Sequence, residues 1–434
     1  MRYIILGGGL SAISLAYFLQ NYDEIAEINI LEKESIAGGL CRSYETNGIT
    51  YDIGPHIIFS KDTEVLDLMN GLLGENIHKL RRSNRIFHKK CFIQYPFEND
   101  LSKLPKEDLD YCVNTFMNNP YENYTAQNML QFFLKTFGEG ITNLYLRPYN
   151  EKIWKFDSSF MDTQMVERIP KPPKEDILKS AAGETIDGYL HQLYFTYPKS
   201  TGIETLIKAF ISKLNTKVKI HTNNEILQLS KKGGEFVIKT AQCEFVSDKV
   251  ISTIPLNKLT QIYKGPKPQK VISIADNLKY NSIIIAIVNV KKDFAGDNFA
   301  FMIADKEVKF HRLSKLNFLG ENYLKENTTT YMLEITYRKG DLVDSTFDEE
   351  IIKQIIKGLQ KINFIESESD VNFTDIRRFE YAYVIYDLHH RQNVDSLKEY
   401  FEKEGILLNG RFGSFEYLNM DAVIRQSMEL AKII

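Results

Sequence analysis

Apolar and polar positions at the start of the chain follow the order of a strand, a helix and a second strand. The apolar run at residues 3–6 leads into three glycines at 7–9, small residues follow as far as Ala12, and a second apolar run occupies residues 28–31. A buried strand, a glycine turn, a helix of small residues and another buried strand make a parallel βαβ unit. Residues 1 to about 60 are therefore expected to be α/β.

The pattern changes twice further along the chain. From about residue 61 to 190, apolar residues recur three and four positions apart, as in 65–69 and 129–134, which predicts helices. Strand-like apolar runs dominate from about 260 to 395, and a closing helix is expected from about Asp421. The runs that predict strands after the helical segment are residues 217–220, 235–240, 250–254, 283–290, 299–303, 328–336, 379–385 and 407–411.

These changes predict a discontinuous first domain with two insertions. The run at 250–254 and the run at 407–411 would return the chain to the sheet of the first domain. We therefore assign residues 1–60, 190–260 and 396–434 to a nucleotide-binding domain. Residues 61–189 would form a mainly helical insertion and residues 261–395 a mainly antiparallel sheet, and the two insertions would provide the substrate side.

The composition of the chain limits the classes of protein to which it can belong. With 434 residues, 43% hydrophobic and 26% charged, the chain has the balance of a globular protein. Its net charge of −3 provides no basic field to attract nucleic acid, and its longest apolar stretch, 282–290, is too short to span a bilayer. The four cysteines lack metal or redox spacing. We expect free thiols, no metal site and a cytoplasmic protein, and the oligomeric state stays open.

The glycine turn has the chemistry of a dinucleotide site. Gly7 permits the tight turn, Gly9 lets the backbone approach a pyrophosphate, and Ala12 lets the helix pack closely on the strand. The helix start at Leu10 and Ser11 would face the phosphates, because the amides of a first helical turn have no partner within the helix. The turn therefore predicts a bound dinucleotide.

A second glycine pair favours FAD over NAD. Glu32 ends the second strand twenty residues after Ala12, where a carboxylate accepts hydrogen bonds from a ribose diol, and Lys33 follows it. Gly39 and Leu40 would extend the lining along a longer cofactor, and Arg42 could meet a phosphate or the flavin edge. The predicted fold class is thus α/β, a discontinuous Rossmann-type FAD-binding domain with a helical insertion and a mainly antiparallel β substrate domain. We expect non-covalent FAD.

A local basic cluster has two interpretations that the sequence leaves open. Residues 81–85 read Arg-Arg-Ser-Asn-Arg, and Lys89 and Lys90 follow. The cluster is either a solvated loop or a binding site for an anionic substrate.

Six further stretches along the chain form an ordered set of motifs. They are 53–60 (Ile-Gly-Pro-His-Ile-Ile-Phe-Ser), 95–99 (Tyr-Pro-Phe-Glu-Asn), 147–154 (Arg-Pro-Tyr-Asn-Glu-Lys-Ile-Trp), Arg168, 310–312 (Phe-His-Arg) and 410–421. Taken in order, these motifs resemble those of the UDP-galactopyranose mutases, and their order and spacing carry the resemblance more than any one motif does. The departures are Glu98, where that family usually has glutamine, and Asn419, where its bacterial members have aspartate.

The resemblance implies an FAD-dependent mutase that interconverts the pyranose and furanose forms of UDP-galactose or a related UDP-sugar. In that family reduced FAD attacks the anomeric carbon through its N5, and NADPH or NADH is a possible reductant. Arg168 and Arg312 would hold the leaving diphosphate, and His56 would lie near the flavin edge. The resemblance adds Gly54, Gly410, Arg411, Asn419 and Met420 as cofactor contacts and Asn99, Tyr149, Trp154, Tyr383, Tyr417 and Asn419 as substrate contacts.

Two further interpretations remain. Residues 378–387 and 197–199 also resemble amine-oxidase-like and protoporphyrinogen-oxidase-like enzymes. Such an enzyme would use oxidised FAD to take hydride from an amine or an apolar substrate, and it predicts a hydrophobic pocket rather than two phosphate-directed arginines. The weakest alternative is a non-catalytic FAD-binding protein. For the mutase, the proline-rich segment 167–173 is expected to close over bound UDP as a unit.

Overall fold

The first apolar runs form the predicted strand-helix-strand unit in the computed structural model, which describes residues 1–166, 169–184, 186 and 193–434. Strands β1 (Arg2–Leu6) and β2 (Glu27–Leu31) pair in parallel, and helix α1 (Leu10–Leu19) connects them. Most of α1 is buried, because α8 (Glu204–Ser212) and the closing helix α14 (Met420–Ile433) pack against it. The small residues of α1 allow this close packing.

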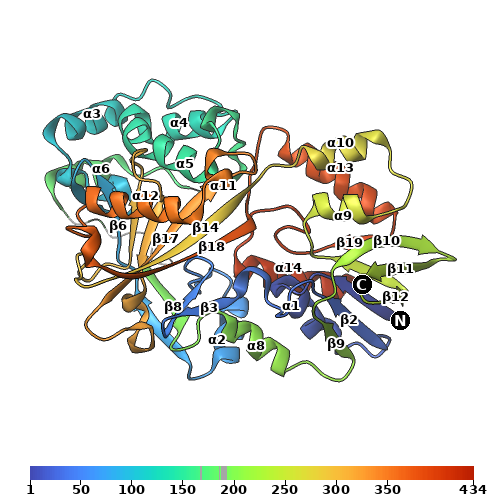
Figure 1. Ribbon diagram of the computed structural model, residues 1–434. Coiled ribbons are helices and arrows are strands. Elements are labelled where there is room, and N and C mark those ends of the chain that lie inside the picture. Colours follow the sequence, from blue (N-terminus) through green and yellow to red (C-terminus); the bar gives the residue numbers. More distant parts are fainter. Residues whose placement is uncertain (167–168, 185, 187–192) are drawn as a thin grey trace.

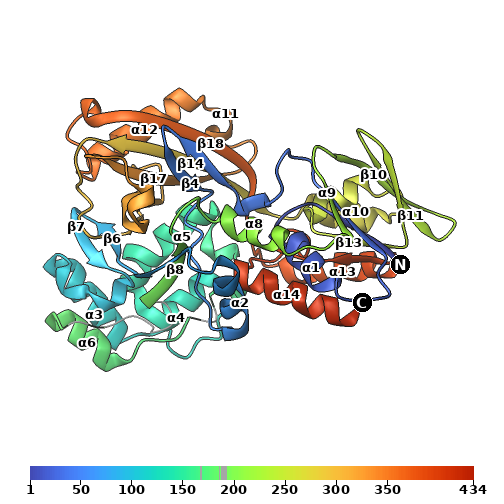
Figure 2. The ribbon, with the colours of Figure 1, turned by 90° about the horizontal axis from the view of Figure 1, so that it is seen from below.

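Five parallel strands from separate parts of the chain make the nucleotide-type sheet. Their order is β19-β13-β1-β2-β9, with β13 at Lys249–Ser252, β19 at Ile406–Leu408 and β9 at Val218–His221. The strands predicted at 217–220, 250–254 and 407–411 therefore join this sheet, and the discontinuous Rossmann-type architecture is confirmed. Figures 1 and 2 show the two chain termini near one another beside this sheet.

A seven-stranded sheet forms the other half of the molecule. Its strand order is β18-β14-β17-β16-β15-β6-β7. All neighbours are antiparallel except β15 and β6, which are parallel, so the sheet is mixed. Helix α12 (Asp348–Lys361) covers one face with the apolar residues at 351, 355 and 359 (Figure 1). The strands are β6 (Asn84–His88), β7 (Cys91–Gln94), β14 (Tyr280–Val290), β15 (Ala300–Ile303), β16 (Arg312–Lys315), β17 (Thr329–Tyr337) and β18 (Val371–Val384).

A group of helices lies beyond the seven-stranded sheet (Figure 1). It contains α3 (Lys106–Met117), α4 (Met129–Ile141), α5 (Arg147–Trp154) and α6 (Lys174–Ala182). The segment predicted as mainly helical thus supplies these helices, and it also supplies β6 and β7 of the sheet. Within the described residues, no helix combines the length and the apolar character needed to cross a bilayer.

Further helices and strands lie outside the two large sheets and this group of helices. The remaining elements are β3 (Ser43–Thr46), β4 (Ile49–Asp52), α2 (Thr63–Leu73), β5 (Ile77–Arg81), β8 (Tyr194–Pro198), β10 (Ile226–Lys232), β11 (Glu235–Thr240), β12 (Glu244–Ser247), α9 (Leu256–Ile262), α10 (Gln269–Asp276), α11 (Leu342–Ser345) and α13 (His390–Lys403). The three-stranded sheet β10-β11-β12 lies beside the parallel sheet (Figure 2).

Candidate cofactor and substrate site

A cavity of about 1490 Å³ is lined by residues from both halves of the molecule. Its walls come from the glycine turn after β1, residues 38–42, residues 53–59, the C-terminal part of β18 and residues 417–421. Drug-sized ligands occupy pockets of about 300–1,000 Å³. The cavity therefore has room for a dinucleotide together with a substrate.

Most of the predicted cofactor residues lie in the cavity wall. Two do not. Ala12 is fully buried within α1, and a Cβ on Gly410 would lie 2.4 Å from Ser11 Cβ, so both serve packing rather than the lining. The predicted cofactor residues in the wall are Gly7, Gly9, Leu10, Ser11, Glu32, Lys33, Gly39, Leu40, Arg42, Gly54, His56, Arg411, Asn419 and Met420.

The two glycine motifs meet at one end of the cavity, which we call the glycine end (residues 7–9, 38 and 39). Gly7 has a φ of +92°, and the Gly38 N–H donates to Gly8 O at 2.7 Å. A Cβ on Gly39 would lie 3.1 Å from Gly9 Cα, so backbone meets backbone here without intervening side chains. A Cβ on Gly9 would contact only Gly39 Cα, at 3.8 Å. A side chain at residue 9 would therefore occupy cavity space without displacing protein atoms.

Glu32 and the start of α1 supply polar groups at the glycine end. The two Glu32 carboxylate oxygens accept hydrogen bonds from Gly8 N and Glu34 N, each at 2.8 Å, and these bonds fix the carboxylate at the wall. Within the described part of the chain, no acceptor is present for the Leu10 and Ser11 amides. Free first-turn amides beside a side-chain-free wall fit a pyrophosphate. These residues therefore fit FAD, and ribose binding by Glu32 stays a prediction.

His56 lies in the cavity wall as a neutral imidazole. Its Nδ1 is buried and has no hydrogen-bond partner among the described residues. Burial lowers the pKa of His56 to about 3, and the positive charges of Arg411 and Arg312 contribute to the lowering. With its pKa lowered this far, the imidazole of His56 is uncharged near neutral pH in the ligand-free protein.

The C-terminal part of the wall is fixed by Arg411. Its Nε donates to Leu418 O at 2.8 Å and its Nη1 to Ala382 O at 3.0 Å. The residue is thus engaged with backbone carbonyls rather than free for a ligand. Asn419 precedes α14 and makes no side-chain capping bond to it, so its amide is available to the cavity.

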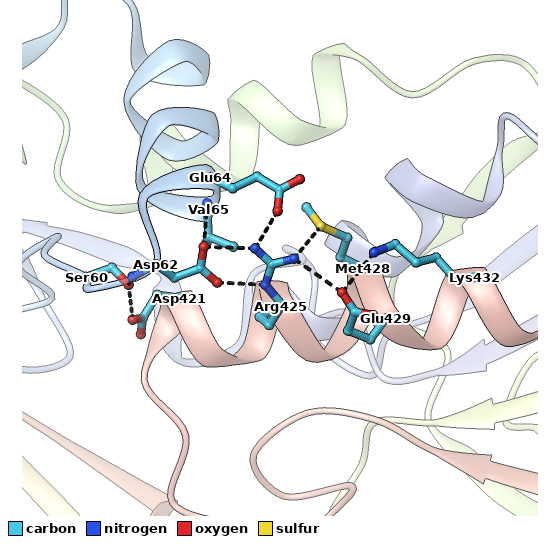
Figure 3. Close-up of polar contacts among 9 residues, drawn as sticks. All are labelled: Ser60, Asp62, Glu64, Val65, Asp421, Arg425, Met428, Glu429 and Lys432. Carbon is cyan, nitrogen blue, oxygen red and sulfur yellow. Dashed lines mark hydrogen bonds and ion pairs between the residues drawn. The ribbon is translucent and has the colours of Figure 1, made fainter.

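An ion-pair network on the surface ties this C-terminal segment to the segment that carries His56 (Figure 3). Arg425 of α14 donates to both carboxylate oxygens of Asp62, at 2.6 and 2.8 Å, and to Glu64 at 2.6 Å. Asp62 also caps α2 by accepting from Val65 N at 3.2 Å. Ser60 donates a hydrogen bond to Asp421, which is also a residue of the cavity wall. The network therefore joins two walls that come from opposite ends of the chain.

Arg312 lies at the other end of the cavity and is paired with Glu334. Its Nη2 donates to Glu334 Oε2 at 2.6 Å, and its Nε donates to the other carboxylate oxygen. Glu334 is completely buried. Burial by itself would lower the pKa of Arg312, but Glu334 more than offsets this and the pKa is raised. A fork-shaped pair of this kind fixes the plane of the guanidinium and leaves Nη1 without a bond to Glu334.

Arg82 is a cavity residue that sequence reasoning did not select on its own. It belongs to the basic cluster for which a solvated loop and an anion site stayed open. Its guanidinium lies over the Phe59 ring, 4.8 Å from the centroid, and its Nε and Nη2 are buried without a hydrogen-bond partner among the described residues. Burial lowers the pKa of Arg82, Tyr95 opposes this, and Arg312 adds to the lowering. We call Arg82, Arg312 and Glu334 the arginine end of the cavity.

Aromatic residues surround the arginine end. Tyr149, Tyr383 and Tyr417, the predicted substrate contacts, all line the cavity, and their contact with substrate stays a prediction. Trp154 does not line it, and instead packs edge-on behind Tyr383 and Tyr417 at centroid distances of 5.7 and 5.6 Å. Trp154 therefore supports the tyrosines, whereas Tyr149 is the aromatic residue of that segment that a substrate could contact.

Helix α5 carries both Tyr149 and Trp154. Side chains of the seven-stranded sheet fix the C-terminus of this helix. Asn281 donates to Ile153 O at 3.0 Å, and Arg338 donates to Trp154 O at 3.0 Å and to Asn281 Oδ1 at 2.9 Å. The last carbonyls of a helix lack partners within the helix. Asn281 and Arg338 satisfy them, and so set where Tyr149 lies.

Besides Trp154, one more predicted substrate residue lies away from the cavity, and another cannot be located in the structure. Asn99 is outside the wall, and its amide donates to Ile186 O at 3.5 Å. Arg168 lies outside the described residues. The structure thus brings Arg312, Tyr149, Tyr383, Tyr417 and Asn419 together in one wall, and adds Arg82 to them.

Two comparisons of the sequence with known proteins cover most of the chain. A sequence model of the flavin containing amine oxidoreductases matches residues 13–395. Coproporphyrinogen III oxidase of Staphylococcus aureus is 20% identical over 475 residues, which cover 99% of this chain and 97% of that protein.

Solved structures share the whole fold. A reduced UDP-galactopyranose mutase superposes with a TM-score of 0.90 at 23% identity, covering 99% of this chain and 94% of that one. An oxidoreductase from Methanosarcina mazei gives a TM-score of 0.69 at 12% identity and covers the full length of both chains.

Proposed function

The chain belongs to the flavin containing amine oxidoreductases, and within that family we propose, from the geometry of its cavity, that it is an FAD-dependent nucleotide-sugar mutase. The proposed reaction interconverts the pyranose and furanose forms of UDP-galactose or a related UDP-sugar. It is an isomerisation within one molecule, so it consumes no electrons overall. Reduced FAD, when bound, would supply the nucleophile, with NADPH or NADH as a possible reductant.

The arginine end is the observation that carries the proposal. An amine substrate is a cation, and the guanidinium of Arg82, which has no counter-ion among the described residues, would repel it. A nucleoside diphosphate sugar instead presents two negative charges and a flat base. Arg312 and Arg82 match the charges, and Tyr149 offers an aromatic surface for the base. The full-length fold similarity to a UDP-galactopyranose mutase, with a TM-score of 0.90, gives further support.

The chain's own residues would orient the substrate and stabilise the leaving diphosphate. Arg312, held in one plane by Glu334, would present Nη1 to a phosphate oxygen. The hydroxyls of Tyr383 and Tyr417 would complete the donor set, and His56 would stay neutral beside the reacting group. We propose that Arg168 also contacts the diphosphate. The glycine end would hold the cofactor, so binding and chemistry occupy opposite ends of one cavity.

A flavin oxidase of an acidic substrate is the second candidate. The similarity to coproporphyrinogen III oxidase covers 99% of this chain, and carboxylates of a tetrapyrrole would also suit two arginines. This candidate requires oxidised FAD and an electron acceptor, whereas the mutase requires reduced FAD and none.

The redox state of the flavin separates the two candidates. The FAD-loaded protein is incubated anaerobically with UDP-galactofuranose, with and without dithionite, and the nucleotides are separated by chromatography. The mutase proposal expects UDP-galactopyranose only after reduction, with no net flavin oxidation during turnover. Activity that requires oxidised flavin and produces hydrogen peroxide in air would instead establish an oxidase.

A further inference from the structure

The arginine end contains one compensated and one uncompensated cation. Arg312 has the buried carboxylate of Glu334 at hydrogen-bond distance, so that pair is neutral overall. Arg82 has no carboxylate within ion-pair distance and no hydrogen bond to its Nε or Nη2 among the residues that the structure describes. Its guanidinium instead lies over the face of Phe59. The net positive charge of this end of the cavity therefore resides on Arg82.

A largely buried guanidinium without a counter-ion is unfavourable in a protein that only has to fold. Removing a charge from water costs free energy unless a partner replaces the lost solvation, and a cation–π contact replaces only part of it. Asn84, two residues further along the same wall, also has a buried Oδ1 without a partner in the described part of the chain. Two unsatisfied polar side chains in one stretch of the cavity wall indicate a site that a ligand completes.

Neighbouring charges point to an anionic ligand. Arg312 and Arg82 are close enough for each positive charge to disfavour the other, which is one cause of the lowered pKa of Arg82. An anion in the cavity beside both would relieve this repulsion. Two other arginines near this wall are already engaged, because Arg85 donates to Asn298 at 2.9 Å and Arg411 donates to two backbone carbonyls. Arg82, in contrast, keeps its Nε and Nη2 without a hydrogen-bond partner among the described residues, so a ligand could engage it.

We propose that Arg82, lying over Phe59, is an anion-binding residue of the substrate site and takes a phosphate or carboxylate oxygen of the substrate. The inference rests on the proposed function for the identity of that substrate. The phosphate would be part of the diphosphate that Arg312 also contacts. A carboxylate would belong to an acidic sugar, such as a uronic acid, attached to the same nucleotide. Either group offers the planar or tetrahedral oxygens that a guanidinium binds through charge-assisted hydrogen bonds.

The test compares Arg82→Gln with the matched control Lys90→Gln. Lys90 is an exposed residue of the same segment, outside the cavity wall, and its replacement removes the same charge. Binding of UDP, UDP-galactose and UDP-galacturonate to each FAD-loaded protein is measured by titration calorimetry. Inorganic phosphate and acetate are titrated in parallel, because their binding does not depend on the nucleotide. FAD content and melting temperature are recorded for both variants.

We expect Arg82→Gln to keep FAD and to weaken UDP binding about ten- to a hundred-fold, the loss typical of a charge-assisted hydrogen bond. Lys90→Gln should change the affinity for UDP by less than about two-fold. If Arg82→Gln loses affinity for UDP-galacturonate alone, Arg82 binds the carboxylate of an acidic sugar, which is the second of the two groups that the proposal names. Unchanged binding of all three nucleotides overturns it, and so does loss of FAD from Arg82→Gln, which would assign Arg82 to the cofactor.

The simple anions separate this inference from the proposed function. If the wild-type protein binds no uridine nucleotide but binds phosphate or acetate in an Arg82-dependent way, the nucleotide-sugar proposal fails and the anion site stands. If UDP binds the wild-type protein and the Arg82→Gln variant equally, and the simple anions do too, the nucleotide proposal stands and the role of Arg82 is wrong.

Discussion

The two ends of the cavity are built in opposite ways. At the glycine end the wall is backbone, Glu32 is held by two backbone amides, and side chains are excluded by contacts such as the 3.1 Å approach of a Gly39 Cβ to Gly9. At the arginine end the wall consists of large charged and aromatic side chains, and one of its cations, Arg82, lacks a counter-ion among the described residues. The backbone fixes the form of the glycine end, whereas the arginine end has a positive charge that no described protein group balances.

This difference teaches how each end recognises its ligand. A backbone wall binds through the approach of a phosphate to free amides, so its function depends on the absence of side chains. A wall of arginines and tyrosines binds through charge and surface, so its function depends on which side chains remain unsatisfied. Substitutions should therefore act through steric exclusion at one end and through electrostatics at the other.

The largest expected effect is loss of FAD from Gly9→Leu. The new side chain would enter the cavity, because a Cβ at this position contacts only Gly39 Cα at 3.8 Å. We expect the variant to fold but to retain almost no flavin, measured by the visible absorbance of the purified protein. Gly71→Leu is the control, since a Cβ at this exposed position of α2 would have no other atom within 4 Å. A yellow Gly9→Leu protein would refute the steric account.

The next effect contrasts the two arginines in the substrate-free holoprotein. Glu334→Gln leaves the partly buried Arg312 without its counter-ion, and removing one partner of a buried pair costs about 3–5 kcal/mol, which the partial exposure of Arg312 should place at the lower end. Arg82→Gln removes a cation that has no counter-ion among the described residues, so the free energy of unfolding of this variant should be unchanged or slightly higher. Chemical denaturation measures both. Equal destabilisation by the two variants would contradict the assignment of Arg82 as uncompensated.

Burial of Glu98 predicts that the stability of the protein depends on pH. Its side chain is 6% exposed, and burial raises its pKa to about 7. An unfolded glutamate has a pKa of about 4.3, so the folded state holds the proton longer and stability falls as the pH rises through the window between these two values. Glu98→Gln abolishes this loss. We expect it to gain on the order of 2 kcal/mol at about pH 8 and almost nothing at about pH 4.

The control for Glu98→Gln is Glu75→Gln, at an exposed position. Thermal melts of both variants across the pH range provide the measurement. A pH-independent gain would indicate that the glutamine improves packing and that Glu98 does not bind a proton in the folded protein at neutral pH.

Arg338→Ala should have a smaller and more local effect. It removes the donor to Trp154 O and the partner of Asn281, so the C-terminus of α5 loosens and Tyr149 is less well placed. We expect about 1–3 kcal/mol lower stability, a changed Trp154 emission and a raised KM for the nucleotide sugar. Arg338→Lys should recover part of this, and Arg391→Ala, an exposed arginine of α13, should leave all three readouts unchanged. Unaltered emission in Arg338→Ala would contradict the positioning role.

The glycine end could be predicted from sequence, and the arginine end only in part, for physical reasons. The turn at Gly7 and the acid at Glu32 act within one local βαβ unit, so their spacing along the chain reports their geometry. The pairing of Arg312 with Glu334 depends on the register of β16 against β17, which no local pattern encodes. The unpartnered state of Arg82 is likewise a property of its packed surroundings.

The sequence motifs also did not indicate which side chains of an element face the cavity. Trp154 was expected to contact substrate because of its motif, but the helical geometry of α5 directs Tyr149 to the cavity and Trp154 behind the tyrosines. Gly410 was expected to line the cofactor, but it is needed where the C-terminal segment crosses Ser11. The apolar spacing at 351, 355 and 359 is the local signal that could have predicted α12 within the segment expected to be mainly strands.

The most direct test of the account is whether the arginine end binds a diphosphate. Trp154 is the only tryptophan, and it contacts Tyr383 and Tyr417 of the cavity wall, so its fluorescence reports ligand binding there whatever the sugar is. The reduced holoprotein is titrated with UDP and with UMP. We predict a saturable change in emission with UDP and a clearly weaker affinity for UMP, which lacks the second phosphate. Equal affinities, or an emission that neither nucleotide changes, would contradict the account.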